Sequence, residues 1–465
     1  MMDYIFKWFE NLQSELPVMY LVGGAVRDWL LEKPTKDIDI VCRDAEKCSQ
    51  IISRKKNVTV IPFKKKVDVP CYRIVDRDDK NFVIDISEMR GDNIYEDLKC
   101  RDFRMNAMAM EIKPGGISDV LIDPLGGQND LRRKLISLCS DHAISDDPLR
   151  TLRAIRFSAQ MGFAIGTNTQ AAICHQAGRL KESAPERIMS ELIRIFNISR
   201  SIDYIRLMDR LGLLEVVLPE IQPMKGCSQN LYHHQDVWEH SLSVLEVLET
   251  IVNDAGNYFG DHSFSVLHCL EKNNRLPILK MAALLHDVAK PVTRIQDPKS
   301  GKIAFYSHDA KGKLILYKVA VRLKMSQKNR VILEMLAGEH IHVVNLAKAG
   351  VKKGTIVRFF RKHGDDAVLL IILSMADSLS KKGPLATKER KKAYLDWCRN
   401  IISEYFVDIK KYLADNDLID GNDLIQMGIA QGPRMGKILR KVRDARDSGM
   451  LQNKQDALVF VKSMF

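Results

Sequence analysis

The stretch Lys36-Asp37-Ile38-Asp39-Ile40-Val41 determines how the first part of the chain is interpreted. A β-strand has a side-chain period of two, so Asp37 and Asp39 lie on one face and the intervening isoleucines on the other. The isoleucines can then pack into a core while the carboxylates face outward. Alone, an Asp-x-Asp pair is most often an exposed strand edge, so its meaning depends on the sequence around it.

A glycine pair precedes these aspartates in Leu21-Val22-Gly23-Gly24-Ala25-Val26-Arg27-Asp28, between a predicted strand and a predicted helix. The backbone N–H groups of Gly23 and Gly24 can approach a triphosphate there, and Arg27 adds positive charge. A Gly-Gly turn alone is commonly just a tight turn. Followed by the aspartate pair, it predicts phosphoryl transfer with two Mg²⁺ ions about 4 Å apart, one activating the attacking hydroxyl and one neutralising the triphosphate.

A third carboxylate is available in Phe82-Val83-Ile84-Asp85-Ile86, a segment predicted to form a strand beside that of Asp37 and Asp39. Asp85 could join the metal site from that strand. A single aspartate on a strand is usually only solvated, and both interpretations stay open.

The apolar pattern predicts an α/β N-terminal domain and an all-helical remainder. Short β-type runs occur at Val18–Val22, Ile38–Val41, Val58–Pro62, Cys71–Val75, Phe82–Ile86 and Ala107–Glu111. From Pro148 onward, apolar residues recur at three- and four-residue spacing, which indicates helices. Breaks near Ser140, at Pro219–Gly226 and at Lys381–Pro384 divide the chain. The predicted domains are residues 1–140, 141–226, 227–382 and 383–465.

Composition indicates a multidomain protein with a polyanionic partner. The 465 residues exceed one ordinary core, and 71 Lys and Arg against 59 Asp and Glu give a net charge of +12.

The 9 cysteines contain no CxxC pair, which argues against a disulfide framework or zinc knuckle. We expect a reducing, cytoplasmic location and no membrane anchor, because the N-terminus does not resemble a signal peptide and the longest apolar run, Ala367–Met375, is far below the ~20 residues of a membrane span.

Further motifs follow in order along the chain. They are Arg101-Asp102-Phe103-Arg104-Met105-Asn106-Ala107-Met108-Ala109, Asp146-Asp147-Pro148-Leu149-Arg150-Thr151-Leu152-Arg153-Ala154-Ile155-Arg156-Phe157 and Pro185-Glu186-Arg187-Ile188. With the glycine and aspartate motifs, they resemble those of the class II (bacterial-type) tRNA nucleotidyltransferases and their poly(A) polymerase relatives. The resemblance covers nearly the whole chain and implies a polymerase-β-like α/β head, a helical neck, an HD body and a tail.

The resemblance also implies the nucleotide contacts. In the family the second motif recognises the ribose and the third selects the base. The implied nucleotide-binding residues are Gly23, Gly24, Arg27, Arg101, Asp102, Asn106, Asp147, Arg150, Arg153 and Arg156. The chemistry is reasonable, because a carboxylate such as Asp147 accepts from the exocyclic amine of cytosine or adenine while Arg150 donates to the ring. Spaced three apart, the two residues are predicted to share one helix face, although an ordinary charged face is the alternative for any single arginine.

Departures from the family pattern bear on which nucleotides are added. Cys100 replaces a common arginine, Arg104 a common threonine and Asp146 a usual glutamate. More informative is the stretch from Glu88 to Tyr95, which is short where members that add the full CCA carry a longer flexible loop. This resembles members that add only the two cytidines. We therefore slightly favour CC addition from CTP over CCA addition from CTP and ATP, with a separate A-adding enzyme as a partner in the same cell.

A set of histidines and aspartates in the middle of the chain resembles an HD domain. Its members, in order, are His240, His286, Asp287, His308, His340 and Asp377. Imidazole and carboxylate together suit transition metals such as Mn²⁺, Ni²⁺ or Fe²⁺ and can support phosphoester hydrolysis. Any one of these histidines alone is more often a core or surface residue. Hydrolysis at the tRNA end and a purely structural body under the tRNA remain alternatives of equal weight.

The tail carries a basic helix beginning at Gly432-Pro433. Arg434, Lys437 and Lys441 are candidates for phosphate contacts along tRNA, with a solvated helix nearly as good an alternative. For the whole protein, the rivals to a tRNA nucleotidyltransferase are a poly(A) polymerase, an HD phosphohydrolase with a decayed transferase head, and a non-catalytic RNA-binding protein. The intact aspartate pair disfavours the last two.

Overall fold

The computed structural model describes residues 8–9, 12, 15–34, 37–66, 69–79, 82–113, 116–348, 350–415 and 417–465; of residues 37, 64–66 and 116 it describes only the backbone. The chain divides into two compact units. Unit 1 comprises Met1–Glu191 and Leu207–Val217, and unit 2 comprises Leu192–Arg206 and Leu218–Phe465. This partition groups the chain differently from the four predicted domains, whose boundaries stay a prediction.

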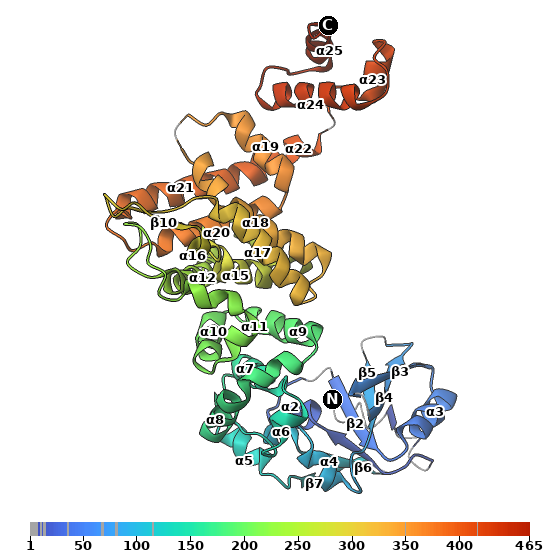
Figure 1. The fold of residues 1–465 in the computed structure, drawn as a ribbon. Coiled ribbons are helices and arrows are strands. Elements are labelled where there is room, and N and C mark those ends of the chain that lie inside the picture. Colours follow the sequence, from blue (N-terminus) through green and yellow to red (C-terminus); the bar gives the residue numbers. More distant parts are fainter. Residues whose placement is uncertain are drawn as a thin grey trace. The chain divides into compact units, whose positions relative to one another are not determined.

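Unit 1 is built on a seven-stranded mixed sheet with the order β3-β4-β5-β2-β1-β6-β7 (Figure 1). Its strands are β1 (Met19–Val22), β2 (Asp37–Cys42), β3 (Val58–Lys66), β4 (Val69–Asp76), β5 (Val83–Glu88), β6 (Ala109–Lys113) and β7 (Gly116–Ile122). Strand β2 pairs antiparallel with β1 and parallel with β5. The aspartate motif therefore lies on a central strand, which rules out the strand-edge interpretation.

Each of the six predicted strands corresponds to an observed strand, whereas β7 was not predicted. Its first half, Gly116-Ile117-Ser118-Asp119, has the composition of a turn, and its antiparallel pairing with β6 stabilises it as a strand. The mixed α/β fold of the N-terminal part is confirmed.

Helices cover the sheet and continue beyond it in unit 1. They are α2 (Gly24–Leu30), α3 (Ala45–Lys55), α4 (Ile94–Lys99), α5 (Gly127–Arg132), α6 (Ala143–Asp146), α7 (Arg150–Met161), α8 (Thr167–Gln176) and α11 (Leu213–Val217), while α9 (Pro185–Phe196) and α10 (Ser201–Arg210) cross the unit boundaries. Two short strands, β8 (Leu135–Ile136) and β9 (Ala164–Ile165), pair in parallel. Helix α4 packs on the sheet through Ile94 and Leu98, which join a core with Val22 and Val41. This packing places the segment after α4 next to the turn that follows β1.

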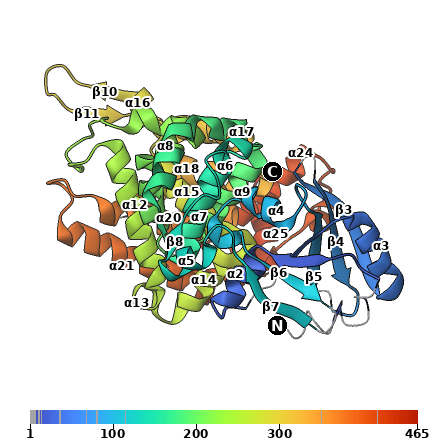
Figure 2. The same cartoon turned by 90° about the horizontal axis from the view of Figure 1, so that it is seen from below.

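Unit 2 is helical. Its main helices are α12 (Val237–Asn253), α13 (Ala255–Phe259), α14 (Ser263–Glu271), α15 (Arg275–Leu285), α16 (Lys290–Thr293), α17 (His308–Arg322), α18 (Gln327–Leu346), α19 (Lys353–His363), α20 (Asp366–Ser380), α21 (Lys388–Glu404), α22 (Lys410–Ala414), α23 (Gly421–Gln426), α24 (Pro433–Asp447) and α25 (Lys454–Lys462). Among the described residues of this unit, β10 (Arg294–Gln296) and β11 (Ile303–Phe305) form a small hairpin that extends away from the helices (Figure 2). The prediction of an all-helical remainder is therefore wrong at this hairpin.

The apolar run Ala367–Met375 forms the middle of α20 and is buried throughout. A helix that is apolar all round belongs in a protein core, and α20 packs against α12, α15 and α18. Among the described helices, none is both long enough and apolar enough to cross a membrane. The run is therefore explained by core packing.

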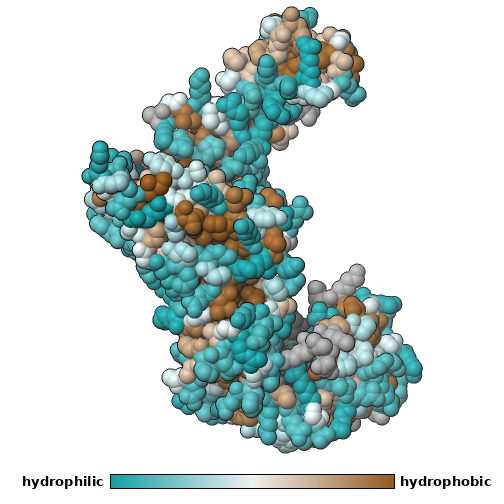
Figure 3. Space-filling view, viewed as in Figure 1, coloured by the Kyte–Doolittle hydropathy of each residue, from teal (hydrophilic) through white to brown (hydrophobic). Residues whose placement is uncertain are grey.

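The last three helices form a small core of their own. Met435, Ile438 and Val442 of α24 pack with Leu424 of α23 and Val461 of α25. The face shown in Figure 3 is mostly hydrophilic, with hydrophobic patches over the helical part of the chain. The predicted basic tail helix is thus present, with its apolar side used for packing.

Candidate functional site

The glycine turn, the aspartate strand and the Arg101 motif meet at one point in unit 1. Gly23 has a positive φ of 72° at the start of α2. A Cβ atom added to Gly23 would lie 3.2 Å from Arg101 Nη1 and 3.5 Å from Asp39 Oδ2. A side chain there would be strained and would fill the space between a cation and a carboxylate. The site therefore requires glycine at this position.

The two neighbouring strands β2 and β5 place two carboxylates side by side. Asp39 and Asp85 are partners in the parallel register, so their side chains leave the sheet on the same face. Asp85 is held by Arg73, whose Nε and Nη2 donate to its two oxygens at 2.9 and 3.0 Å. The side chain of Asp37 lies outside what the structure describes. Asp85 is thus an ion-paired carboxylate beside Asp39 rather than a merely solvated one.

A chain of hydrogen bonds connects α2, the Asp102 motif and α7. Arg27 Nη1 donates to Asn106 Oδ1 at 2.7 Å, and Asn106 Nδ2 donates to Asp102 Oδ1 at 3.1 Å. Arg153 Nε and Nη2 donate to Asp102 Oδ2 at 2.9 and 2.5 Å. Four of the predicted nucleotide-binding residues therefore form one continuous polar network.

Asp102 is the charged centre of this network. Its burial acts to raise the pKa, but Arg153 and the hydrogen bond from Asn106 outweigh burial and lower the pKa of Asp102 to about 2. Asp102 in turn raises the pKa of Arg153. The carboxylate is ionised and rigidly held, and Arg153 remains partly exposed.

The structure corrects the prediction that Asp147 and Arg150 share a helix face. Asp147 has extended backbone dihedrals and lies between α6 and α7, because Pro148 separates it from the helix. Its oxygens accept from Nη1 and Nη2 of Arg187 on α9 at 3.3 and 3.0 Å. Arg150 is buried and donates to the backbone oxygens of Cys100 and Ala143 at 2.6 and 3.2 Å. Burial lowers the pKa of Arg150, although Asp102 and Asp147 oppose this effect.

Cys100 contributes through its backbone. Its carbonyl accepts from Arg150 and, at 3.3 Å, from Arg90. A different side chain at this position leaves both contacts possible, so the departure from the family pattern does not disturb this link.

Arg156 occupies a buried ion pair. Its Nε donates to Glu191 of α9 at 2.6 Å and its Nη1 to Gln160 at 2.8 Å, and both charged side chains are below 10% exposed. Its guanidinium also lies 4.1 Å from the ring centroid of Phe157. These contacts give Arg156 a packing role between α7 and α9, and its predicted nucleotide contact stays untested.

Sequence analysis assigned no role to the partners of the predicted residues, although Arg187 and Phe157 stand within the quoted motifs. Arg187 is 40 positions from Asp147, and Glu191 is 35 positions from Arg156. Asp97 holds Arg101 through hydrogen bonds of 3.0 and 2.9 Å, and the i,i+4 spacing of this last pair is the one signal the sequence offered. Phe157 packs beneath Arg27, Arg153 and Arg156. These residues orient the ones that motif matching found.

In unit 2 the six predicted HD residues come together; five of them are buried and His308 is partly exposed. They come from α12, the turn after α15, α17, α18 and α20. Two groups each bring three potential ligand atoms within 4.8 Å of one another; they are His240, His286 and Asp377, and Asp287, His308 and His340. Nitrogen and carboxylate donors in this number suit a divalent transition metal.

In three of the histidines, a hydrogen bond from Nδ1 to the backbone fixes the ring so that Nε2 can act as a metal ligand. Nδ1 of His286, His308 and His340 lies 3.0, 2.8 and 2.8 Å from the backbone oxygens of Ala283, Phe305 and Ala337. Backbone carbonyls only accept, so each Nδ1 carries a proton and Nε2 points toward the cluster. The buried Nε2 of His286 lies 3.0 Å from Asp287 Oδ2, so nitrogen and carboxylate ligand atoms face each other in the cluster. The donor set therefore fits a metal ion.

A pocket of about 620 Å³ opens onto this cluster. Lysine and arginine side chains line it together with aromatic ones; among them are Lys290, Lys381, Arg390, Tyr232, Phe305 and Tyr306. His233, which sequence reasoning missed, also lines the pocket and packs edge to face against His240 with ring centroids 4.3 Å apart. Burial and the charge of Lys290 lower the pKa of His233 to about 2. The pocket combines a metal-ligand cluster with positive charge suited to a phosphate ester.

The tail residues that are predicted to contact tRNA lie on the exposed face of α24. Arg434, Lys437 and Lys441 are exposed, whereas Met435 and Ile438 on the opposite side are buried. Arg434 also lies over the ring of Phe465 at 4.6 Å. The three cations share one face because they are spaced by three and four residues.

Three known families match successive parts of the chain. Residues 19–137 match the poly A polymerase head domain, residues 162–225 match the probable RNA and SrmB-binding site of polymerase A, and residues 237–382 match the HD domain. These matches cover the glycine turn, the aspartate strand and the histidine cluster.

Curated relatives match over nearly the full length. A CC-adding tRNA nucleotidyltransferase of Thermus thermophilus is 30% identical over 95% of this chain and 92% of its own length. An A-adding tRNA nucleotidyltransferase of Deinococcus radiodurans is 29% identical over 96% and 95%. A multifunctional CCA protein of Legionella pneumophila is 29% identical over 74% and 79%.

Solved structures share the fold. A CCA-adding enzyme in complex with CTP aligns with a TM-score of 0.64 at 20% identity, covering 99% of this chain and 94% of that one. The Thermotoga maritima CCA-adding enzyme in complex with tRNA aligns with a TM-score of 0.61 at 20% identity, covering 100% and 94%. At this identity the likeness concerns architecture alone.

Proposed function

Because the chain belongs to the tRNA nucleotidyltransferase and poly(A) polymerase family and is a tRNA nucleotidyltransferase, we propose that it adds two cytidines, and no adenosine, to the tRNA 3′ end. The observation that carries CC specificity is the short connection between β5 and α4. Arg90 N donates to Asp97 at 3.1 Å, Asp92 N donates to Glu96 at 2.7 Å, and Asn93 caps α4. A connection so short and so tied to α4 leaves no long flexible loop with which to switch from CTP to ATP. We further propose that a separate enzyme adds the terminal adenosine.

The transferase site would hold two Mg²⁺ ions through Asp37 and Asp39. Hard carboxylate oxygens are the ligands that Mg²⁺ prefers, and Asp85 lies in register to assist. When bound, such ions activate the 3′-hydroxyl and neutralise the triphosphate. The chain's own contribution is to bind and orient CTP between the β2 carboxylates and the arginines.

The polar network provides the nucleotide contacts in this proposal. The backbone N–H groups at Gly23 and Gly24, with Arg27 and Arg101, bind the triphosphate. The Asn106–Asp102 pair, held by Arg153, contacts the ribose. Asp147 accepts from the exocyclic amine of cytosine while Arg150 donates to the ring, and Arg187 holds Asp147 in place.

Three tRNA transcripts test the specificity directly. They end at the discriminator base, at C and at CC, and each is incubated with CTP, ATP or both. We expect extension of the first two to CC and no product from the third. Extension to CCA would refute CC specificity in favour of CCA addition. Addition of A to the CC transcript alone would identify an A-adding enzyme, and long A tails would identify a poly(A) polymerase.

A second function, metal-dependent phosphoester hydrolysis, is favoured by the complete buried histidine–aspartate cluster beneath a basic pocket. His240, His286, Asp287 and their neighbours would hold Mn²⁺, Ni²⁺ or Fe²⁺, which when bound activates water for attack on phosphorus. Lys290 and Lys381 would orient the phosphate. The full chain is assayed with bis-nitrophenyl phosphate, and the His286→Ala/Asp287→Ala chain is expected to lose the activity. Unchanged hydrolysis in that chain would leave the domain as a helical body only.

A further inference from the structure

Asp447, the last residue of α24, is a buried carboxylate at the contact between α24 and α19. Its side chain has no exposed surface, and Arg361 of α19 donates to both of its oxygens, from Nε at 3.1 Å and from Nη2 at 2.5 Å. Tyr412 of α22 donates to the same carboxylate at 3.1 Å. Arg361 and Tyr412 lie outside the core that the last three helices form by themselves. One carboxylate at the end of α24 is therefore held by two earlier helices.

The backbones of α19 and α24 come very close at this point. A Cβ atom added to Gly354, in the first turn of α19, would lie 2.8 Å from the backbone oxygen of Asp447 and 3.0 Å from the Cα of Ser448. Backbone atoms cannot move aside as a flexible side chain can, so any other residue would push the two helices apart. The end of α24 is therefore closely packed on α19.

A second ion pair joins the same two helices one turn earlier and differs in its exposure. Arg358 and Asp444 approach to 3.9 Å, and 47% of each side chain is exposed. Such a pair contributes little, because water screens it and both side chains stay mobile. Breaking a buried pair instead leaves a charge without a partner or water, which is strongly destabilising. The docking of α24 on α19 should therefore depend on Asp447 and Arg361.

The docked end of α24 sets the direction of its basic face. Arg434, Lys437 and Lys441 lie on earlier turns of the same helix. At 1.5 Å per residue, roughly 20 Å of helix separates Arg434 from Asp447, so a small rotation at Asp447 moves Arg434 a long way. A large ligand that needs several contacts at once binds more tightly when their directions are fixed in advance.

We propose that Asp447 and Arg361 are positioning residues for tRNA, because they fix the basic face of α24 relative to the preceding helices before tRNA binds. The proposal rests on the predicted tRNA contacts of the α24 cations and goes beyond them, since neither positioning residue touches tRNA. An undocked α24 would be correctly directed in only a fraction of the molecules. The apparent affinity for tRNA would fall by that fraction.

Substitution of the pair separates positioning from direct phosphate contact. Asp447→Leu or Arg361→Met alone leaves one unpaired charge and should raise the KM for tRNA by about tenfold or more, with kcat and the KM for CTP nearly unchanged. The double variant replaces the ion pair by apolar side chains, which a buried site tolerates well. It should return the KM for tRNA to within about threefold of the wild-type value.

Asp444→Leu is the matched control, because it makes the same change on the same helix at the exposed position. It should leave the KM for tRNA unchanged. Hydrogen exchange of the full chain measures docking without any assay of activity, and the last turns of α24 should exchange faster in the two single variants. Circular dichroism checks that each variant folds, and Asp447→Asn replaces Asp447→Leu if the latter does not fold.

Single variants with faster exchange in α24 and an unchanged KM for tRNA would overturn the proposal, because docking would then serve the fold alone. A double variant that exchanges as slowly as wild type but does not recover the KM for tRNA would also overturn it, since Arg361 would then contact tRNA directly. Unweakened tRNA binding after replacement of Arg434, Lys437 and Lys441 by Gln would instead refute the predicted contacts of α24. The failures are therefore distinguishable.

Discussion

Asp102 shows how one residue of a motif serves structure and site together. It is 8% exposed and receives hydrogen bonds from Asn106 and Arg153. A buried carboxylate without partners would be protonated or destabilising. Here the two partners keep the carboxylate of Asp102 ionised and fix its direction, so Arg153 and Asn106 are as necessary to this polar network as Asp102 itself.

The low pKa of Asp102 predicts a pH-dependent stability difference. Its folded pKa of about 2 is below the ordinary 3.8, so its ionisation stabilises the folded state above about pH 4 and the stabilisation is lost as the pH falls toward 2. The Asp102→Asn variant should be less stable by about 2 kcal/mol near neutral pH. Urea unfolding of both proteins between about pH 6 and pH 3 checks this, with a difference that shrinks below pH 4. A difference that stays constant across that range would contradict the assignment.

A second residue prediction concerns Asp39. Loss of one metal-ligating carboxylate should remove several kcal/mol of transition-state stabilisation, so Asp39→Asn should lower CTP incorporation by about 10³-fold or more. Single-turnover incorporation into a tRNA transcript lacking CCA measures the effect. Asp119→Asn on β7 is the control, because Asp119 is an exposed carboxylate on the same sheet. Equal activity of the two variants would exclude Asp39 from catalysis.

At the scale of elements, local patterns predicted six of the seven strands of the main sheet and the helical character of the later chain, whereas long-range pairs set the roles of their side chains. The alternation in residues 37–41 was enough to predict β2, with Asp39 on the face opposite the buried Ile38 and Ile40. Nothing local could predict that Asp147 pairs with Arg187, because that contact joins residues 40 positions apart. The prediction that Asp147 lies on the helix was wrong for a local reason, because the residue before a proline disfavours helical dihedrals.

The ion pair between α7 and α9 gives a prediction at this scale. Removing one partner of a buried pair leaves an unpaired charge, so Arg156→Met or Glu191→Leu alone should destabilise unit 1 by about 3–5 kcal/mol. The double variant should lose less than the sum of the two. Urea unfolding of the four proteins measures the coupling. If Arg156→Met instead left stability unchanged and raised the KM for CTP, Arg156 would be a nucleotide contact.

At the scale of the whole chain, the ordered motifs predicted more than any composition argument could. The six HD residues are brought together although His240 and Asp377 are 137 positions apart. Residue types alone do not predict such a cluster; the resemblance to a known domain did. What the resemblance could not supply was the distances between Asp287 and the imidazoles around it, because these depend on side-chain directions set by the surrounding helices.

The net charge of +12 concerns the whole molecule, but its effect on tRNA binding should depend on where the charges lie. Each lysine or arginine that contacts phosphate releases counterions on binding, so its removal lowers the salt dependence of affinity. Replacing Arg434, Lys437 and Lys441 by Gln should therefore weaken tRNA binding and make the slope of log K against log salt shallower by about 3. Filter binding at several salt concentrations measures this slope.

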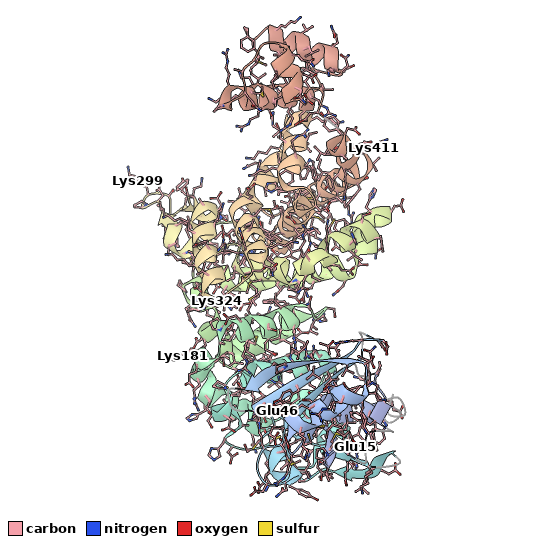
Figure 4. All side chains as sticks on the ribbon, turned by 90° about the vertical axis from the view of Figure 1, so that its right-hand side faces the viewer. Glu15, Glu46, Lys181, Lys299, Lys324 and Lys411 are labelled. Carbon is pink, nitrogen blue, oxygen red and sulfur yellow. The ribbon has the colours of Figure 1, made fainter. Side chains whose placement is uncertain are left out.

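A matched control removes the same charge elsewhere. Lys181, Lys299 and Lys324 are exposed and extend outward from their elements (Figure 4). Their replacement by Gln changes net charge equally but removes no residue of the α24 face. We expect a nearly unchanged slope, because screening over about 10 Å at ~0.1 M salt limits charges that do not touch the phosphates. Equal slopes for the two triple variants would mean that tRNA senses only net charge, and α24 would then be a solvated helix.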